Sequence, residues 1–384
     1  MSDRSALLAR RIFDGEIWRE DAALIVDDDR VEAIASRRAL PFGLPKSDLG
    51  EIFLAPGFVD LQVNGGGDVM FNDRRRADAI RTICAAHAPF GTTAVLVTLI
   101  TDTPTGTSEA IAAGLEATRL GVAGFAGLHL EGPHLALSRK GAHDPELIRP
   151  MEETDVERLI AARRDMPALL TTVATESIAP DQIRRLTQAG VVVSLGHSDA
   201  TYEDAATAVE AGASMATHLF NAMSQIGNRS PGLVGAALDL GGAWAGLIAD
   251  GVHVDPVNIG IALRAKRGPG RIFLVTDAMS TIGSDITEFM LNGRVVKRHN
   301  GRLTLADGTL AGADLDMISA VRFMRDRVGV PLEEALRMAS LYPAMSMGLD
   351  GGYGRLTPAG RADFVALTED LRVASVWIAG KKVA

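Results

Sequence analysis

Four ionisable side chains each stand directly after an otherwise apolar run, and together they could bind a metal ion. They are Glu131, His197, His218 and Asp277. Two histidines and one carboxylate are a sufficient ligand set for catalytic zinc, with the fourth position open to water. Taken alone, a histidine at a strand end is more often structural, and an aspartate can cap a helix. Four such residues would each need compensation for their burial, so the pattern favours a metal site.

The end of the first candidate strand bears on the number of ions. Many barrel hydrolases with two metals carry His-x-His there and bridge the ions with a carboxylated lysine on the fourth strand. Here the first strand ends in Gln62-Val63-Asn64, whose amides are weak neutral ligands, and residues 169–175 contain no lysine. We therefore expect one metal ion.

Three further residues are candidates for contacts with a substrate. His143 lies in the loop after the third strand, where it either is exposed or faces Glu131. Arg229 and His253 are candidate anion binders, because a guanidinium can grip a phosphate with two hydrogen bonds, although a solvated loop charge is the commoner role. The sequence contains no phosphate-binding Gly-x-x-x-x-Gly-Lys-Ser/Thr loop, no Gly-x-Gly-x-x-Gly after a strand and no Gly-x-Ser-x-Gly elbow.

The elements that would position these residues alternate between strand and helix. Eight runs rich in Val, Leu, Ile and Ala are typical of strands buried on both faces: 57–63, 94–99, 125–130, 169–174, 191–196, 214–219, 244–249 and 272–277. Helical segments include 74–88, 105–119, 153–164, 178–189, 202–211, 255–266 and 313–327. This is the pattern of an α/β protein with a (β/α)8 TIM-like barrel, and a doubly wound open sheet is the rival. In a barrel, the loops after the strands meet at one face, which would gather the candidate residues in one mouth.

Both ends of the chain carry short alternating segments. These are 22–26 and 30–35 near the N-terminus and 364–367 and 373–379 near the C-terminus. We expect residues 1–55 and 356–384 to form one small β-sandwich domain, the alternative being two unrelated decorations on a barrel that spans 56–355. Two Asn-Gly dipeptides and one Asp-Gly dipeptide predict a β insertion near 289–310, on the rim of the barrel.

Composition and charge exclude several classes of protein. The 384 residues are 47% hydrophobic and 23% charged, as in an ordinary globular protein, so a disordered or collagen-like chain is excluded. A net charge of −9 without long runs of one sign makes nucleic acids and anionic membranes poor partners. We expect neither a membrane span nor a signal peptide. The single cysteine, Cys84, cannot form an intramolecular disulfide, which favours the cytoplasm.

Several blocks of sequence resemble a known family. They are Ala55-Pro56-Gly57-Phe58-Val59-Asp60-Leu61, Gln62-Val63-Asn64-Gly65, His129-Leu130-Glu131-Gly132-Pro133, Lys140-Gly141-Ala142-His143, Leu195-Gly196-His197-Ser198, Thr217-His218-Leu219-Phe220-Asn221-Ala222-Met223, Asp250-Gly251-Val252-His253, Thr276-Asp277-Ala278 and Leu310-Ala311-Gly312. The first block resembles the opening of an amidohydrolase superfamily barrel. The whole set, in this order, resembles the N-acetylglucosamine-6-phosphate deacetylases and spans most of the barrel.

The resemblance implies a role for each matching residue. Glu131, His197 and His218 would hold one divalent metal ion, usually zinc, while Asp277 would act as general base and acid. His143 would polarise the acetyl carbonyl. The implied substrate-binding residues are Ala142, Asn221, Ala222, Arg229, His253, Leu310, Ala311 and Gly312.

The implied reaction is hydrolysis of the acetamide of N-acetylglucosamine 6-phosphate to glucosamine 6-phosphate and acetate. The resemblance also implies a homodimer, because family members can complete their phosphate contacts across a dimer interface. Departures from the family pattern at 134–138, Asp144 and Asp316 remove no catalytic group, but they bear on which sugar the pocket accepts. One alternative is therefore a deacetylase of a related sugar phosphate, such as N-acetylgalactosamine 6-phosphate. The other is an inactive sugar-phosphate-binding barrel, which the presence of the complete set of catalytic residues disfavours.

Overall fold

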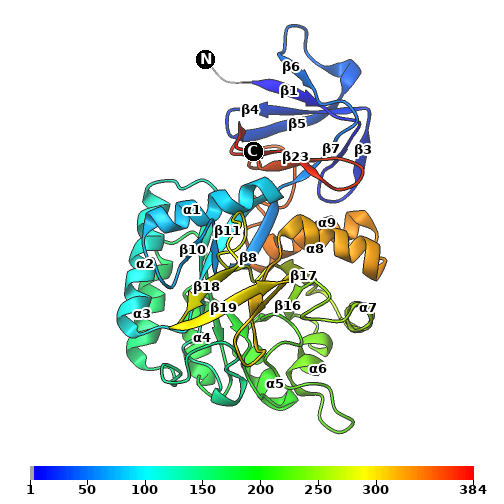
Figure 1. Cartoon of the computed structure of the whole chain (residues 1–384). Coiled ribbons are helices and arrows are strands. Elements are labelled where there is room, and N and C mark those ends of the chain that lie inside the picture. Colours follow the sequence, from blue (N-terminus) through cyan, green and yellow to red (C-terminus); the bar gives the residue numbers. More distant parts are fainter. Residues whose placement is uncertain (1–3) are drawn as a thin grey trace.

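The structure, a computed structural model, describes residues 4–384 and consists of a barrel and a smaller β domain (Figure 1). Eight parallel strands form one sheet in the order β17-β16-β15-β14-β13-β12-β11-β8. They are β8 (Phe58–Val63), β11 (Thr92–Ile100), β12 (Phe125–Glu131), β13 (Leu169–Val173), β14 (Val192–Leu195), β15 (Met215–Ala216), β16 (Trp244–Ile248) and β17 (Ile272–Val275). All eight predicted runs form strands of this sheet.

The first and last strands close the sheet into a barrel. Val63 and Ala278 form an isolated parallel bridge across the seam between β8 and β17. The buried Asp60 carboxylate accepts hydrogen bonds from the Thr276 N–H at 3.2 Å and from the Thr276 hydroxyl at 2.5 Å. The predicted (β/α)8 barrel is therefore confirmed, and the doubly wound open sheet is excluded.

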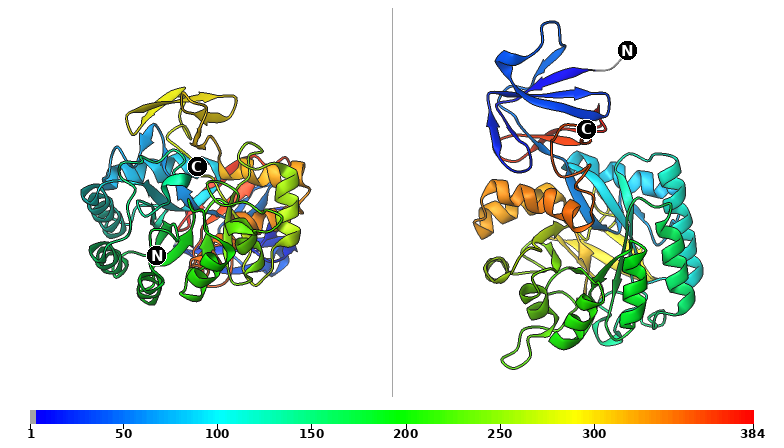
Figure 2. Two further views of the ribbon diagram at one scale, coloured as in Figure 1. Left: turned by 90° about the horizontal axis from the view of Figure 1, so that it is seen from below. Right: turned by 180° about the vertical axis from the view of Figure 1, so that it is seen from behind.

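Helices surround the strands, as the view in Figure 2 (left) shows. They are α1 (Ala77–His87), α2 (Pro104–Arg119), α3 (Glu153–Arg163), α4 (Pro180–Gln188), α5 (Tyr202–Glu210), α6 (Gly232–Asp239), α7 (Pro256–Ala265), α8 (Met317–Phe323), α9 (Leu332–Ala339) and α10 (Leu341–Ser346). Their first residues follow local rules. Proline stands at the first position of α2, α4 and α7, where its missing N–H costs nothing, and Thr201 and Asp204 form a capping box on α5. The helix expected at 313–327 begins only at Met317, because the Asp316 side chain caps it, and it continues into a π-helix, Met324–Val328.

The strands read as continuous apolar runs because both of their faces are covered. Helices pack on the outside of the barrel, and side chains from the other strands fill the inside. All nine residues of β11 are buried, and so are all seven of β12. A polar residue in this sheet therefore has to find its partner inside the protein.

The β domain is built from both ends of the chain. One sheet has the order β5-β4-β1-β6, and the other has the order β24-β23-β22-β7-β2-β3. The strands are β1 (Ser5–Leu8), β2 (Arg11–Phe13), β3 (Trp18–Glu20), β4 (Ala22–Asp27), β5 (Arg30–Ser36), β6 (Lys46–Asp48), β7 (Phe53–Pro56), β22 (Phe364–Leu367), β23 (Val373–Ile378) and β24 (Lys381–Lys382). C-terminal β22 pairs with N-terminal β7, and the rings of Phe364 and Trp377 stack at 4.7 Å in the core. The predicted small β domain from both termini is confirmed, although the exact boundaries stay a prediction.

A four-stranded antiparallel sheet, called the rim sheet below, projects from the barrel (Figure 2, left). It consists of β18 (Glu288–Leu291), β19 (Arg294–His299), β20 (Arg302–Thr304) and β21 (Leu310–Ala313). Both residues of its Asn292-Gly293 and Asn300-Gly301 turns have positive φ, as tight hairpins require. A short hairpin of β9 (Gly65–Gly66) and β10 (Val69–Met70) follows β8. Among residues 4–384, no helix is both long and apolar enough to cross a membrane.

Candidate active site

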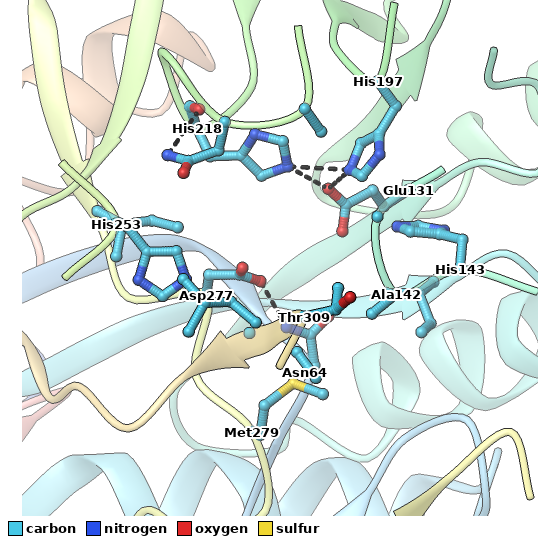
Figure 3. A pocket seen from close by; sticks show the side chains of 18 of the residues that line it. Asn64, Glu131, Ala142, His143, His197, His218, His253, Asp277, Met279 and Thr309 are labelled. Carbon is cyan, nitrogen blue, oxygen red and sulfur yellow. Dashed lines mark hydrogen bonds and ion pairs between the residues drawn. The ribbon is translucent and has the colours of Figure 1, made fainter. Parts of the chain in front are cut away.

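A cavity of about 260 Å³ lies at the carboxyl ends of the barrel strands, with the rim sheet as one of its walls (Figure 3). It is lined by Asn64, Ile100, Glu131, Gly141, Ala142, His143, His197, His218, Asn221, Ala222, Ile248, His253, Asp277, Met279, Leu291, Thr309, Leu310, Ala311 and Gly312. Every site residue expected from the sequence is in this set except Arg229. The barrel thus brings together residues that lie as much as 248 positions apart along the chain (64 to 312).

Three side chains from three strand ends point toward one another in Figure 3. Glu131 ends β12, His197 follows β14 and His218 follows β15. The Glu131 Oε1 atom lies 3.3 Å from His197 Nε2 and 3.0 Å from His218 Nε2. The two Nε2 atoms are 3.0 Å apart, and all three side chains are at least 94% buried.

This arrangement fits a divalent metal ion. An ion bound tetrahedrally at about 2.0–2.1 Å keeps its ligand atoms about 3.3 Å apart, close to the separations seen here. The Nε2 atoms of His197 and His218 face each other, and at most one proton can lie between them. A metal cation, in contrast, can attract the lone pairs of both nitrogens. His143 is a rival ligand, because Glu131, His143 and His197 can also offer three donor atoms within 4.8 Å of one another.

The charges in this group depend on one another. Burial alone would raise the pKa of Glu131, but hydrogen bonds to His197 and His218 hold it well below its usual value. Burial alone would lower the pKa of His218, but its hydrogen bond to Glu131 raises it. The carboxylate therefore stays ionised, as a metal ligand must be.

The orientation of His197 is set from outside the group. Its Nδ1 atom lies 2.7 Å from the Arg139 carbonyl oxygen. A proton on Nδ1 would satisfy that carbonyl and leave the Nε2 lone pair free, which is the usual arrangement for a metal-binding histidine. Arg139 is itself anchored, because its side chain and Ser138 both donate to the carboxylate of Asp199.

Asp277 lies on the other side of the cavity, two residues after β17. Its Oδ1 atom accepts hydrogen bonds from Asn64 Nδ2 at 2.7 Å and Gln62 Nε2 at 3.1 Å. Burial, together with the nearby Glu131 carboxylate, raises the pKa of Asp277 to about 6. A carboxylate with such a pKa is better suited than an ordinary aspartate to exchange protons near neutral pH.

His143 stands beside the metal-binding group in neutral form. Burial and the neighbouring His197 lower the pKa of His143 to about 3. Its Nδ1 atom lies 2.7 Å from the Thr101 hydroxyl oxygen, and its ring is 4.4 Å from the ring of His197, centroid to centroid. A neutral imidazole held in this way can donate or accept one hydrogen bond inside the cavity.

The backbone at several of these positions is strained. His197, His218, Ala222 and Asp277 have φ values of 49°, 28°, 48° and 51°, in a region that residues other than glycine seldom adopt. Strain of this kind persists where the surrounding structure enforces it, and it concentrates at functional sites. Three of the four residues are those whose side chains meet in the cavity, so the turn out of each strand aims its side chain inward.

The remaining predicted residues divide into two groups. Ala142, Asn221, Ala222 and the Leu310–Gly312 segment line the cavity, as does His253, whose Nδ1 lies 2.7 Å from the Asp250 carboxylate. Arg229 does not line it. The arginine is exposed in the 224–231 loop, so a contact with the substrate of its own subunit is not supported, and its role stays a prediction.

The sequence reasoning missed the apolar wall of the cavity. Ile100, Met279 and Leu291 belong to a small hydrophobic cluster shared with the rim sheet. Ile100 ends β11 and Met279 stands two residues after Asp277, so their positions after strands were a usable signal. Leu291 offered none, because nothing in a hairpin sequence shows which way the hairpin folds.

A chain of buried polar groups beneath the cavity was also missed. His129 Nε2 lies 2.7 Å from the Thr172 hydroxyl, which lies 2.7 Å from that of Thr217, and Ser194 follows at 2.6 Å. Burial lowers the pKa of His129 to about 4, so the ring stays neutral. The chain links four consecutive strands just below Glu131 and His218 and so stabilises their relative positions.

Comparison with known proteins agrees with this site. The sequence pattern of the Amidohydrolase family matches residues 53–383, which include the whole barrel. Together with the barrel and its carboxylate–histidine centre, this match defines the class: the chain belongs to the amidohydrolase family, whose members are metal-dependent hydrolases.

Individual relatives narrow the class. A Shewanella sp. protein named N-acetylgalactosamine-6-phosphate deacetylase is 44% identical over 331 residues, covering 85% of this chain and 82% of that protein. A Haemophilus influenzae protein named N-acetylglucosamine-6-phosphate deacetylase is 34% identical over 367 residues, covering 94% of each. The crystal structure of N-acetylglucosamine-6-phosphate deacetylase from Pasteurella multocida superimposes with a TM-score of 0.95 at 36% identity, covering 99% of each chain. The resemblance noted in the sequence is therefore confirmed.

Proposed function

We propose that this protein hydrolyses the acetamide of N-acetylglucosamine 6-phosphate, releasing acetate and glucosamine 6-phosphate. The observation that carries the proposal is one cavity in which side chains suited to hold a cation face a carboxylate with a raised pKa. Hydrolysis of an amide needs both functions, because the carbonyl must be polarised and a proton must travel from water to the departing amine. The names of the relatives support the acetamide and the 6-phosphate.

Glu131, His197 and His218 would hold one divalent ion, with zinc the best match to two imidazoles and a carboxylate. When bound, such an ion supplies Lewis acidity and makes water more acidic. Asp277 would take the proton from the attacking water and then deliver it to the leaving nitrogen. His143, with Thr101 donating to Nδ1, would keep its proton on Nε2 and donate a hydrogen bond to the acetyl oxygen, whose negative charge grows during the attack.

The sugar phosphate would occupy the rest of the cavity. Asn221, Ala222, Ala142 and the Leu310–Gly312 segment are placed to contact the sugar, and His253 is placed to contact the phosphate. Arg229 lies in an exposed loop beside Ile226, which is 58% exposed. We propose that this loop reaches the phosphate bound by a second copy of the chain, in a homodimer.

A second candidate substrate is N-acetylgalactosamine 6-phosphate. The Shewanella relative that carries this activity in its name has the higher sequence identity of the two relatives described above. The two sugars differ only in the configuration of one hydroxyl, so the same catalytic groups would serve both. A cytoplasmic location is also part of the proposal, supported by the single buried free cysteine, Cys84.

Acetate release by the zinc-loaded protein tests these proposals. N-Acetylglucosamine 6-phosphate, N-acetylgalactosamine 6-phosphate and unphosphorylated N-acetylglucosamine would be compared side by side. Fastest release from the first is expected, fastest release from the second would make the galactosamine epimer the substrate, and no release from any would overturn the deacetylase proposal. Arg229→Ala should raise KM for the phosphorylated sugar only, while Arg184→Ala, an exposed arginine on α4, is the matched control.

A further inference from the structure

Two amide side chains at the end of β8 have no part in the mechanism described above. Gln62 lies in β8 and Asn64 directly follows its last residue, and both side chains reach the Asp277 carboxylate inside the barrel. Both are almost fully buried, and both donate to the same oxygen of Asp277, at 3.1 Å and 2.7 Å. The Asn64 contact is marked by a dashed line in Figure 3.

The contacts with Asp277 are asymmetric. Both amides meet Oδ1, and among the hydrogen bonds within residues 4–384 none engages Oδ2. The Asp277 N–H also donates to the Gln62 carbonyl oxygen at 2.9 Å, which holds the backbone of the aspartate against the same strand. One carboxylate oxygen is thus fixed from β8, and the other is left for the cavity.

Gln62 also connects the two carboxylates of the site. Its Nε2 atom donates to Glu131 Oε1 at 3.0 Å as well as to Asp277 Oδ1. Two buried carboxylates repel each other, and a donor placed between them offsets part of that repulsion. The Oδ1 atom of Asn64 is buried without a hydrogen-bond partner among the described residues, so the side chain contributes its donor rather than its acceptor.

We propose that Gln62 and Asn64 are positioning residues that clamp Oδ1 of Asp277 and so assign the proton transfers of hydrolysis to Oδ2. The inference rests on the proposed function, in which Asp277 is the general base and acid. Held at one oxygen, the carboxylate cannot rotate about its Cβ–Cγ bond, and its second oxygen keeps one direction toward the substrate. Such preorganisation accounts for a sizeable part of the rate of many enzymes.

The clamp also affects the affinity of Asp277 for protons. Hydrogen bonds to the ionised form favour ionisation, so losing one should make the carboxylate harder to ionise. The other groups that face Asp277 are Glu131 from β12, which raises its pKa, and His218 and His253 from the loops after β15 and β16, which lower it. The Asn64 amide donates to none of these three groups, so its removal leaves their contacts in place.

The test compares three variants of the zinc-loaded protein. Asn64→Ala removes one donor and touches no proposed metal ligand, and Gln62→Met removes the other donor at nearly constant length. Asn72→Ala is the matched control, because Asn72 is also a buried asparagine near the barrel mouth but bonds to the backbone of Ile100. The measurements are kcat and KM against pH, zinc content, and crystal structures of the wild type and Asn64→Ala.

In both clamp variants, kcat should fall about tenfold or more with KM nearly unchanged. The acidic limb of the kcat profile should move up by about one pH unit. The crystal structure should show the Asp277 carboxylate turned about its Cβ–Cγ bond, and zinc content should stay the same in Asn64→Ala. Asn72→Ala should keep the wild-type limb even if it is less stable.

An unmoved acidic limb in both clamp variants would overturn the proposal, and so would an equal shift in Asn72→Ala. Loss of zinc from Asn64→Ala would also overturn it, since the amide would then serve the metal centre. If the wild type releases no acetate from any sugar phosphate, the proposed function fails. The clamp is then tested only by comparing the orientation of the Asp277 carboxylate in the two crystal structures. A carboxylate that keeps its orientation in Asn64→Ala then rejects the clamp, and a rotated one supports it.

Discussion

Two clusters of ionisable groups, each around a buried carboxylate, include residues of the loop that follows β12, and they differ in how their members are paired. In the first, which we call the Asp155 cluster, Asp155 accepts from Arg149 at 2.6 and 2.8 Å and from Arg158 at 2.8 Å, and His134 lies nearby. Burial alone would raise the pKa of Asp155, but Arg149 holds it well below its usual value. Both arginines there hydrogen-bond the shared carboxylate, so each charged group contacts one of opposite sign.

In the second cluster, which lies in the cavity, the ionisable groups are not paired with groups of opposite charge in this way. Nε2 atoms of two histidines face each other across 3.0 Å, and a second carboxylate, Asp277, lies close enough to be affected by Glu131. The backbone is strained at His197, His218 and Asp277, whereas none of the residues of the Asp155 cluster has a positive φ. Complete pairing is typical of a cluster that stabilises the fold. Atoms that converge without neutralising one another are typical of a cluster that binds something else.

The largest expected effect is that of Asp277→Asn. Turnover should fall by about 10³-fold or more, because the general base and acid is lost while the shape of the side chain is kept. Zinc content should not change, and the melting temperature should stay the same or rise. An active variant would show that Asp277 is not the general base and acid. The cavity cluster would then no longer differ from the Asp155 cluster by a catalytic role. Acetate release and metal analysis on the same sample check this.

The substitution His143→Asn should have the next largest effect on turnover. Loss of one hydrogen-bond donor to a developing oxyanion reduces kcat by about 10²-fold, and KM should change little. Zinc content separates the two roles that the geometry allows for His143. Unchanged zinc supports a role in polarising the substrate, whereas loss of zinc would make His143 a ligand with Glu131 and His197.

Asp155→Ala should show the opposite behaviour. Removing the shared partner leaves Arg149 and Arg158 unpaired, which should cost about 3 kcal/mol in the free energy of unfolding. Per folded molecule, kcat should equal that of the wild type. Urea unfolding and acetate release measure the two quantities, and Glu153→Ala on the same helix is the control, because it breaks only an exposed pair with Arg185 and should not change stability measurably. A large loss of kcat in Asp155→Ala would show that the cluster is not purely structural.

The smallest effect concerns stability of the metal-free protein against pH. The pKa of Asp277 is raised from 3.8 to about 6 in the folded state, so the folded protein binds this proton more tightly than the unfolded chain. Below about pH 4 this aspartate therefore does not lower the free energy of unfolding. Above about pH 6 it lowers the free energy of unfolding by its full amount. Metal-free Asp277→Asn should gain about 2 kcal/mol over the wild type at pH 8 relative to pH 4. Equal stability differences at both pH values would contradict the raised pKa.

Much of the site could be predicted from the sequence because of where the residues stand. Glu131, His197, His218 and Asp277 each follow a buried apolar run, and a barrel gathers such positions at one face. The Asp155 cluster could not be recognised in this way. Asp155 lies in the first turn of α3, where a sequence reading sees only a favourable charge at a helix N-terminus, and its partner Arg149 lies in a loop.

The reach of sequence reasoning follows from the distance over which each interaction acts. Strand and helix periodicity, the proline and capping residues at helix starts, and the Asn-Gly turns of the rim sheet are local, so the chain specifies them directly. The choice of partner is not local. That Gln62 bonds to both Glu131 and Asp277, that Leu291 forms a wall of the cavity and that Arg229 does not reach it depend on how the barrel closes and how the rim sheet and loops fold over it. Those contacts join residues tens to hundreds of positions apart, and they exist only once the tertiary structure brings them within hydrogen-bonding or van der Waals distance.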